Sequence, residues 1–162
     1  MPQTVPEFAD LLRALNSESV RYVVVGGLAM ILHGSTYVTF DLDLAISADD
    51  SSSAAMVRAL APLHPFPPQL GSASNFVWDE RSFQTAVVEL ITDAGQIDIL
   101  RIVPGVDSFD GLWERSEVRK LSGLDVRVAC IDDLIAMKSA ANRAKDRDHI
   151  RQLQILRSLN QS

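Results

Sequence analysis

The sequence predicts an α/β protein of the α+β type, in which helices cover a mixed sheet and further helices end the chain. Two observations support this class. Between residues 21 and 129, short β-branched or alternating apolar segments are interleaved with segments of helical periodicity. Residues 131–158 carry helical patterns only. Because a half-apolar sheet must bury one face, this mixture favours helices packed on a sheet within one domain.

The first three predicted elements surround a pair of glycines. Residues 6–17 predict a helix because apolar side chains recur at i, i+3, i+4 and i+7; they are Phe8, Leu11, Leu12 and Leu15. Residues 21–25 are rich in β-branched and aromatic side chains and predict a buried strand. The Gly26-Gly27 pair ends this strand, and residues 28–32 suit a short helix.

A strand, a helix and a loop come next. Residues 40–46 alternate acidic and apolar side chains, which is the two-residue period of a strand with one apolar face. Asp49 is suited to cap a helix that extends to about residue 63. Residues 64–76 contain several prolines and Gly71, so they predict a loop.

Two hairpins and two helices complete the predicted order. Residues 84–91 and 96–103 predict strands that are joined by a turn at Asp93-Ala94-Gly95. A smaller hairpin is expected around Gly123, followed by two closing helices. These last four elements are expected at residues 118–121, 126–129, 131–142 and 146–158.

The composition limits the class of protein. The chain is expected to form one domain over residues 1–162, with a core at 20–103 and a C-terminal helical part at 130–158. Hydrophobic residues make up 47% and charged residues 22%, which excludes a disordered or fibrous protein. The single cysteine, Cys130, excludes an internal disulfide and favours a reducing, cytoplasmic setting.

Charge and hydropathy also restrict the partners. The net charge of −6 disfavours a general nucleic-acid coat protein, which needs a basic face. An acidic protein that handles nucleotides usually needs a divalent cation between its carboxylates and the phosphates. The sequence shows neither a secretory leader nor an apolar run long enough to span a membrane, so no membrane partner is expected.

The sharpest chemical signal is a set of three carboxylates on predicted strands. Asp41 and Asp43 lie two residues apart, so both side chains project from one face of their strand. A hard divalent cation such as Mg²⁺ would offset the repulsion between them. Asp98, alone between apolar residues of a later strand, would complete a three-carboxylate metal site and take a proton from an attacking hydroxyl. Taken alone, the Asp-Leu-Asp pattern is equally consistent with the polar face of an edge strand, and Asp98 with a solvent-facing hairpin residue.

Upstream of these carboxylates, the Gly26-Gly27 pair follows a buried strand. Glycines there let the backbone approach a ligand closely, and the start of the next helix offers free N–H groups to a phosphate. The same pair is also common in tight strand-to-helix turns that bind nothing. Residues 28–40 give room for a short helix and a return into the neighbouring strand, which would place the turn beside the carboxylates.

In combination, the apolar-Gly-Gly step, the Asp-apolar-Asp pair and the later apolar-Asp-apolar strand resemble the polymerase-beta-like nucleotidyltransferase superfamily. The local sequences are similar to bacterial members of unassigned role and to the nucleotidyltransferase toxins of toxin–antitoxin and abortive-infection systems. The likeness covers roughly residues 20–155 and rests on segments 26–29, 33–34, 39–43, 112–115, 132–138 and 141–146. Tyr37 departs from the pattern, because similar proteins often carry Arg or Lys shortly before the Asp pair.

The resemblance implies a nucleotidyltransferase fold and a reaction that moves a nucleoside monophosphate from an NTP to an acceptor hydroxyl. It implies two Mg²⁺ ions, held by the three carboxylates Asp41, Asp43 and Asp98. It also implicates further residues in holding the nucleotide; these are Gly26, Gly27, Thr39, Lys138, Arg143 and Lys145.

Two of the C-terminal residues allow different interpretations. By helical position alone, Lys138 falls on an apolar face and is expected to snorkel outward, whereas the resemblance assigns it to the triphosphate. Asp146 either caps the last helix in a solvated loop or turns inward to orient Lys138 or Arg143.

The acceptor and the biological role stay open. The resemblance is compatible with a toxin that acts on RNA or protein and has a cognate antitoxin as partner. The rival interpretations are an antibiotic-modifying nucleotidyltransferase and a non-catalytic nucleotide-binding or antitoxin protein. The presence of all three carboxylates argues against a protein that only binds.

Overall fold

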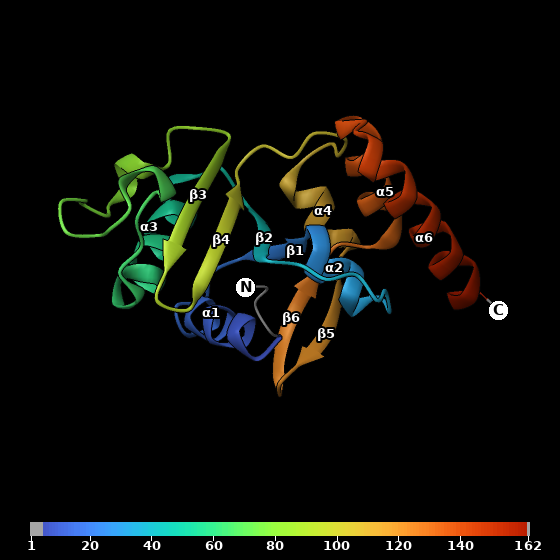
Figure 1. Cartoon of the computed structure of the whole chain (residues 1–162), viewed down its shortest axis with the longest axis horizontal. Helices are drawn as coiled ribbons and strands as arrows, with labels where there is room; N and C mark the ends of the chain where they lie inside the picture. Colours follow the sequence, from blue (N-terminus) through green and yellow to red (C-terminus); the bar gives the residue numbers. More distant parts are fainter. Residues whose placement is uncertain (1–4, 162) are drawn as a thin grey trace.

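A six-stranded mixed sheet forms the centre of the computed structural model, which describes residues 5–161 (Figure 1). The strands lie in the order β3-β4-β2-β1-β6-β5. Their bounds are β1 Tyr22–Val25, β2 Asp41–Ile46, β3 Val87–Thr92, β4 Gly95–Leu100, β5 Glu117–Leu121 and β6 Leu124–Val128. The pairs β2–β4 and β1–β6 are parallel and the others are antiparallel, so the predicted mixed sheet is confirmed.

Helices precede, interrupt and follow these strands. They are α1 Val5–Ser17, α2 Gly26–Leu32, α3 Asp50–Leu60, α4 Phe109–Arg115, α5 Ile131–Ala141 and α6 Ala144–Asn160. Three short 3₁₀ turns are also present: η1 Ala61–Leu63, η2 Pro68–Leu70 and η3 Glu80–Ser82. Within residues 5–161, no helix combines the length and the hydrophobicity that crossing a membrane requires.

The two faces of the central strands have different surroundings. In β2, Leu42 and Leu44 are fully buried, whereas Asp41 and Asp43 point to the opposite face and are half-buried. Helices α1 and α3 pack against each other and contribute to the core on the apolar side. The largest fully buried side chains are Phe8, Leu11, Leu12, Leu15, Leu28, Met30, Leu42, Leu44, Ile46, Met56, Leu60 and Leu90. The alternation seen in the sequence therefore separates a core face from a polar face.

Several predicted boundaries shift, each for a local reason. Helix α2 begins at Gly26 itself, because the first glycine takes a left-handed conformation and turns the chain directly into the helix. Helix α3 ends at Leu60, and the turn η1, which contains Pro62, covers the last predicted residues. Strand β4 ends at Leu100 instead of residue 103. The next two backbone N–H groups both donate to the carbonyl of Ala86, so the regular ladder stops there.

Helix α4 is an element that the sequence patterns did not predict. It has seven residues, too few to show a helical period, and it includes Gly111, which disfavours a helix interior. Its start is set by Ser108, whose hydroxyl accepts a hydrogen bond from the backbone N–H of Gly111 at 3.0 Å. Because Leu112 is fully buried, packing compensates for the weak local preference.

Candidate active site

Three carboxylates meet where β2 and β4 run side by side. The parallel register of the two strands places Asp43 opposite Asp98, and Asp41 lies two residues earlier on the same face. One carboxylate oxygen from each residue lies within 4.8 Å of the others. Strands β3 and β4 form a hairpin, and this returns Asp98 to the strand next to the Asp pair. The structure thus brings together the three acidic residues that the sequence singled out.

The close carboxylates perturb one another. Burial raises the pKa of Asp98 to about 8, and its hydrogen bond with Asp41 and the charge of Asp43 act in the same direction. Burial and the charge of Asp41 raise the pKa of Asp43 to about 6. At neutral pH the cluster therefore keeps a proton. Three crowded carboxylate oxygens match the ligand preference of a hard divalent cation, which would offset their repulsion.

The two glycines bring the start of α2 against this cluster. Gly26 has φ +66°, and a Cβ atom there would collide with the Oδ2 atom of Asp43. A Cβ on Gly27 would lie 2.7 Å from both the Thr39 Cβ and the Tyr37 Cε1 atoms. The packing of the protein's own residues therefore already requires glycine at positions 26 and 27. Thr39 donates a hydrogen bond from Oγ1 to the backbone carbonyl of Asp41 at 3.0 Å, which ties the preceding loop to β2.

A buried carboxylate organises the cations on the opposite side. Asp146 is fully buried and accepts hydrogen bonds from the backbone N and the Nε of Arg143, at 2.9 and 2.8 Å. The Nζ atom of Lys138 lies 3.6 Å from its other oxygen. These contacts lower the pKa of Asp146 to about 2, with the Arg143 side chain as the largest cause. Of the two interpretations of Asp146, the structure shows the inward one.

The predicted start of the last helix was wrong by two residues. Helix α6 begins at Ala144 with Arg143 as its N-cap, and Asp146 is the third helical residue. From there its carboxylate accepts the hydrogen bond of the N-cap backbone, as the acidic residue of a capping box does. Asn142, in a left-handed conformation between α5 and α6, makes the tight turn.

Lys138 is largely buried, with 13% of its side chain exposed. Burial lowers its pKa, and nearby Arg143 acts in the same direction, while Asp146 opposes the shift. The outward snorkelling expected from helical position alone therefore does not occur. A buried ammonium group beside a carboxylate cluster is available to balance the charge of an anion in the space between them.

A polar cavity of about 260 Å³ lies between the carboxylates and the cations. Every residue that the sequence proposed for metal or nucleotide binding lines it. The lining residues are Gly26, Gly27, Tyr37, Thr39, Asp41, Asp43, Asp98, Lys138, Arg143, Lys145 and His149. Opposite charges thus face each other across one space, next to the glycine turn.

His149 and Tyr37 are the lining residues that the sequence did not assign to the site. Their rings contact edge to face, with centroids 4.7 Å apart. Burial lowers the pKa of His149, and the charge of Lys138 adds to this, which favours the neutral imidazole. The one available signal was spacing, because His149 follows the inward-facing Asp146 by three residues, close to one helical turn.

A family profile identifies the chain. The DUF6036 family, described as a nucleotidyltransferase of unknown function, matches residues 3–161. The chain belongs to this family. Membership of the DUF6036 family agrees with the resemblance noted from the motifs and makes the protein a nucleotidyltransferase. No curated protein matches this DUF6036 member in sequence.

Solved structures show that the DUF6036 chain has a nucleotidyltransferase fold. A lincosamide antibiotic adenylyltransferase, LnuA, solved with lincomycin bound, superposes with a TM-score of 0.66 at 15% identity, covering 96% of this chain and 99% of that one. A putative nucleotidyltransferase from Thermotoga maritima gives 0.52 at 17% identity, covering 97% and 95%. An antigenic nucleotidyltransferase-like protein from Paracoccidioides brasiliensis gives 0.51 at 16%, covering 98% and 78%. At these identities the likeness establishes the fold alone.

Proposed function

We propose that the protein transfers a nucleoside monophosphate from an NTP to an acceptor hydroxyl in a reaction that depends on Mg²⁺ and releases pyrophosphate. The observation that carries this proposal is the polar cavity, in which three carboxylates face three cationic side chains beside a glycine turn. A triphosphate with its divalent cations is a ligand whose charges match both walls. Membership of the DUF6036 family, described as a nucleotidyltransferase of unknown function, supports this class of reaction.

In this proposal the carboxylates Asp41, Asp43 and Asp98 hold two Mg²⁺ ions. The crowding of their oxygens within 4.8 Å and the raised pKa values of Asp43 and Asp98 support the assignment. When bound, such ions act as Lewis acids that stabilise negative charge on the phosphates. Most of the rate enhancement would then come from positioning and electrostatics.

The cationic wall would hold the triphosphate. Lys138, Arg143 and Lys145 line the polar cavity opposite the carboxylates, and Asp146 fixes the direction of the first two through its hydrogen bonds and ion pairs. The backbone at Gly26 and Gly27 contributes a surface that side chains do not block. An anion placed here is expected to bind through charge-assisted hydrogen bonds.

Asp98 is suited to accept the proton of the attacking hydroxyl. Burial raises the pKa of Asp98 to about 8 in the metal-free protein; bound cations would favour its ionised form, which can accept a proton. The hydroxyl oxygen would form a bond to the α-phosphorus, its proton would move to the Asp98 carboxylate, and the bond to pyrophosphate would break. Atoms and charge balance without any further reactant.

The proposal leaves two classes of acceptor, a small molecule or a macromolecule. A lincosamide adenylyltransferase is among the structural neighbours, which is compatible with the alternative of a small-molecule acceptor. The toxin-type role, with RNA or protein as the acceptor and an antitoxin as the partner, stays a prediction that follows from the motif resemblance.

The direct test is transfer of label from each α-labelled NTP in the presence of Mg²⁺ and a cell lysate. Wild-type protein is expected to label an acceptor, and Asp41→Asn and Asp43→Asn are expected to abolish the label. Glu89→Gln is the matched control, because Glu89 is an exposed carboxylate opposite Asp98 on β3. Transfer by the aspartate variants at the wild-type rate would refute the assignment. Absence of both transfer and Mg²⁺-dependent NTP binding would favour the non-catalytic alternative.

A further inference from the structure

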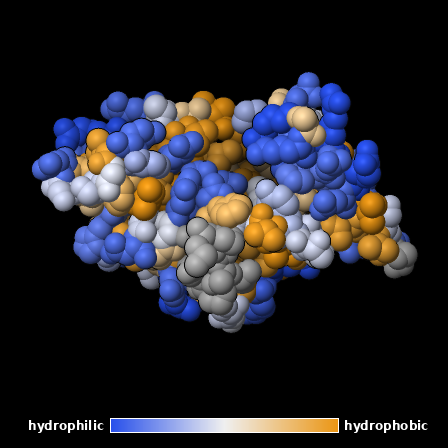
Figure 2. Space-filling model, viewed as in Figure 1, coloured by the Kyte–Doolittle hydropathy of each residue, from blue (hydrophilic) through white to orange (hydrophobic). Residues whose placement is uncertain are grey.

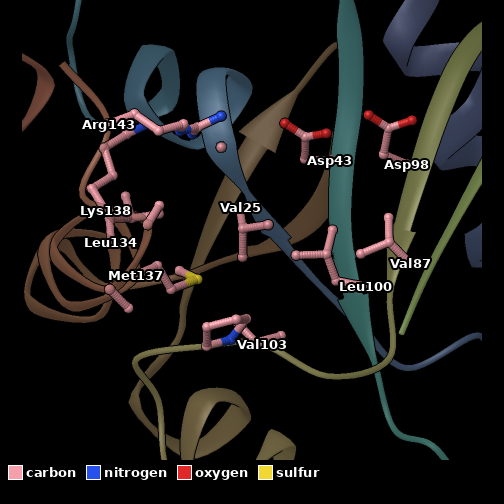
Figure 3. A pocket seen from close by; sticks show the side chains of 14 residues that line it. Val25, Asp43, Val87, Asp98, Leu100, Val103, Leu134, Met137, Lys138 and Arg143 are labelled. Atoms are coloured by element: carbon pink, nitrogen blue, oxygen red, sulfur yellow. The ribbon is translucent and has the colours of Figure 1, made fainter. Parts of the chain in front are cut away.

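A second cavity, of about 340 Å³, adjoins the polar one. It lies between the sheet and α5, and we call it the apolar cavity (Figure 3). Most of its wall comes from aliphatic side chains, including Val25, Val87, Leu100, Val103, Leu134 and Met137. In the space-filling view, hydrophobic residues gather in the hollow between the β3–β4 hairpin and the C-terminal helices (Figure 2).

The walls of this cavity are held in place by regular structure. Leu100 follows Asp98 by two residues and therefore shares its face of β4, and Val87 is its register partner on β3. The chain then leaves the sheet and reaches α5 at Gly105. Gly105 has φ +93°, and a Cβ there would collide with the backbone of Ala136. This contact joins α5 to the segment after β4, whose Val103 and Pro104 line the apolar cavity.

The other end of the apolar cavity is formed by the carboxylates. Asp43 and Asp98 line both cavities, with Arg143 on the facing side (Figure 3). Lys145 and the Tyr37–Thr39 loop line only the polar cavity. Gly26, Lys138 and Arg143 also line both cavities, so the two cavities meet at the carboxylates and cations, and the proposed general base, Asp98, faces both.

The volume and the lining of the apolar cavity favour a small molecule over single-stranded RNA as its occupant. Its volume is at the lower end of the range of about 300–1,000 Å³ that small-molecule sites occupy. Single-stranded RNA is usually held by stacking on aromatic side chains and by cations along its backbone. Among the described residues that line the cavity, none is aromatic, and its two cations, Lys138 and Arg143, also line the polar cavity, where the proposal assigns them to the triphosphate.

We infer that the apolar cavity is the acceptor site and that the acceptor is a small molecule with an aliphatic body and a hydroxyl group. The hydroxyl would lie next to Asp98, and the aliphatic part would be buried along Val87, Leu100 and Met137. Burial of that apolar surface would supply the favourable free energy of binding. The inference rests on the proposed function, because it assigns the acceptor of that reaction.

A matched pair of tryptophan variants on α5 tests the site. Ala141 is exposed and lines the apolar cavity, one turn after Met137 and Lys138, so Ala141→Trp fills the cavity without entering the core. Ser139 is exposed on the same helix and lines neither cavity, so Ser139→Trp is the control. Transfer from α-labelled NTP is measured with three separated acceptor pools: dialysable small molecules, RNA and dialysed protein. Binding of Mg²⁺–NTP to each variant is measured by calorimetry.

The expected result is label in the dialysable pool. Ala141→Trp should reduce this transfer by about tenfold or more while the Kd for Mg²⁺–NTP stays within about twofold, and Ser139→Trp should behave as wild type. If the label enters RNA or protein, with or without an effect of Ala141→Trp, the inference is overturned although the proposed function stands. If Ala141→Trp weakens NTP binding as much as transfer, the cavity holds the nucleoside and the inference is again overturned.

Two further outcomes are also decisive. If wild-type protein neither binds Mg²⁺–NTP nor transfers label, the proposed function fails, and the acceptor site fails with it. If Mg²⁺–NTP binds but no pool is labelled, titration with octyl glucoside, an alkyl chain with a hydroxylated head, decides. The site is supported if wild type and Ser139→Trp bind octyl glucoside and Ala141→Trp does not. The inference is overturned if wild type does not bind it, or if Ala141→Trp binds it as wild type does.

Discussion

Replacing Asp98 with asparagine should stabilise the metal-free protein at alkaline pH and have a smaller effect at about pH 5. Burial, followed by contact with Asp41 and Asp43, raises the pKa of Asp98 from 3.8 to about 8. Between these values the folded state binds more protons at this carboxyl than the unfolded state does. The free energy of unfolding therefore falls as the pH rises through this window, and an amide removes that dependence.

The size of the effect follows from the spacing of the cluster. Unit charges 4.8 Å apart repel by about 3 kcal/mol at an effective dielectric constant of about 20, and by about 1 kcal/mol in water. Asp98 is half-buried and the side chains can relax apart, so a value in the middle of this range applies. We expect Asp98→Asn to be more stable than wild type by about 2 kcal/mol at about pH 9.

Urea unfolding in the presence of EDTA, at about pH 5 and about pH 9, measures this difference. Glu89→Gln, which removes an exposed carboxylate next to the cluster, should change stability by less than about 0.5 kcal/mol at either pH. An equal gap between Asp98→Asn and wild type at both pH values would refute the reasoning, as would a less stable asparagine variant at alkaline pH. Excess Mg²⁺ should stabilise wild type more than the variant, since the amide is a poorer ligand.

Three other substitutions probe the site. Asp146→Ala should cost about 3 kcal/mol in urea unfolding, because it leaves Arg143 and the buried Lys138 without their carboxylate; a loss below about 1 kcal/mol would contradict this. Gly26→Ala should lower the melting temperature far more than Gly71→Ala, since both have positive φ but only Gly26 lies against another side chain; equal effects would show that backbone strain alone matters. Lys138→Met should raise the Kd for Mg²⁺–NTP about tenfold in calorimetry without lowering stability, and an unchanged Kd would remove this lysine from the triphosphate site.

Much of the fold could be predicted because local patterns agree with it. Residues 40–46 alternate acidic and apolar side chains, and their strand has one fully buried and one polar face. The two hairpins were recognisable from their turns. Helix α4 was missed because its seven residues include a glycine and its stability depends on the burial of Leu112, which no local pattern reports. The same limit applies to the strand ends near residue 100, which are decided by hydrogen bonds to Ala86.

The part of the candidate site that depends on residue type and spacing could be predicted from the sequence. The Asp-Leu-Asp strand, the lone Asp98 and the paired glycines were recognisable without coordinates, because their spacing alone predicts on which face of a strand or turn they lie. The burial of Asp146 could not be predicted, since an aspartate at the start of a helix can face either solvent or the core. His149 was not assigned to the site, because its spacing from Asp146 is informative only once Asp146 is known to face inward.

By itself, the sequence determined the fold class and three acidic positions, because periodicity and residue type act over a few neighbouring residues. Only the tertiary structure decided that the carboxylates share one cluster, that α5 and α6 direct Lys138 and Arg143 toward it, and that an apolar cavity opens beside Asp98. The parallel pairing of β2 with β4 creates the cluster, and the packing of α5 beside the sheet creates the cavity. Both depend on contacts between segments far apart in the chain, and the free energy of such contacts is not encoded in any short stretch of residues.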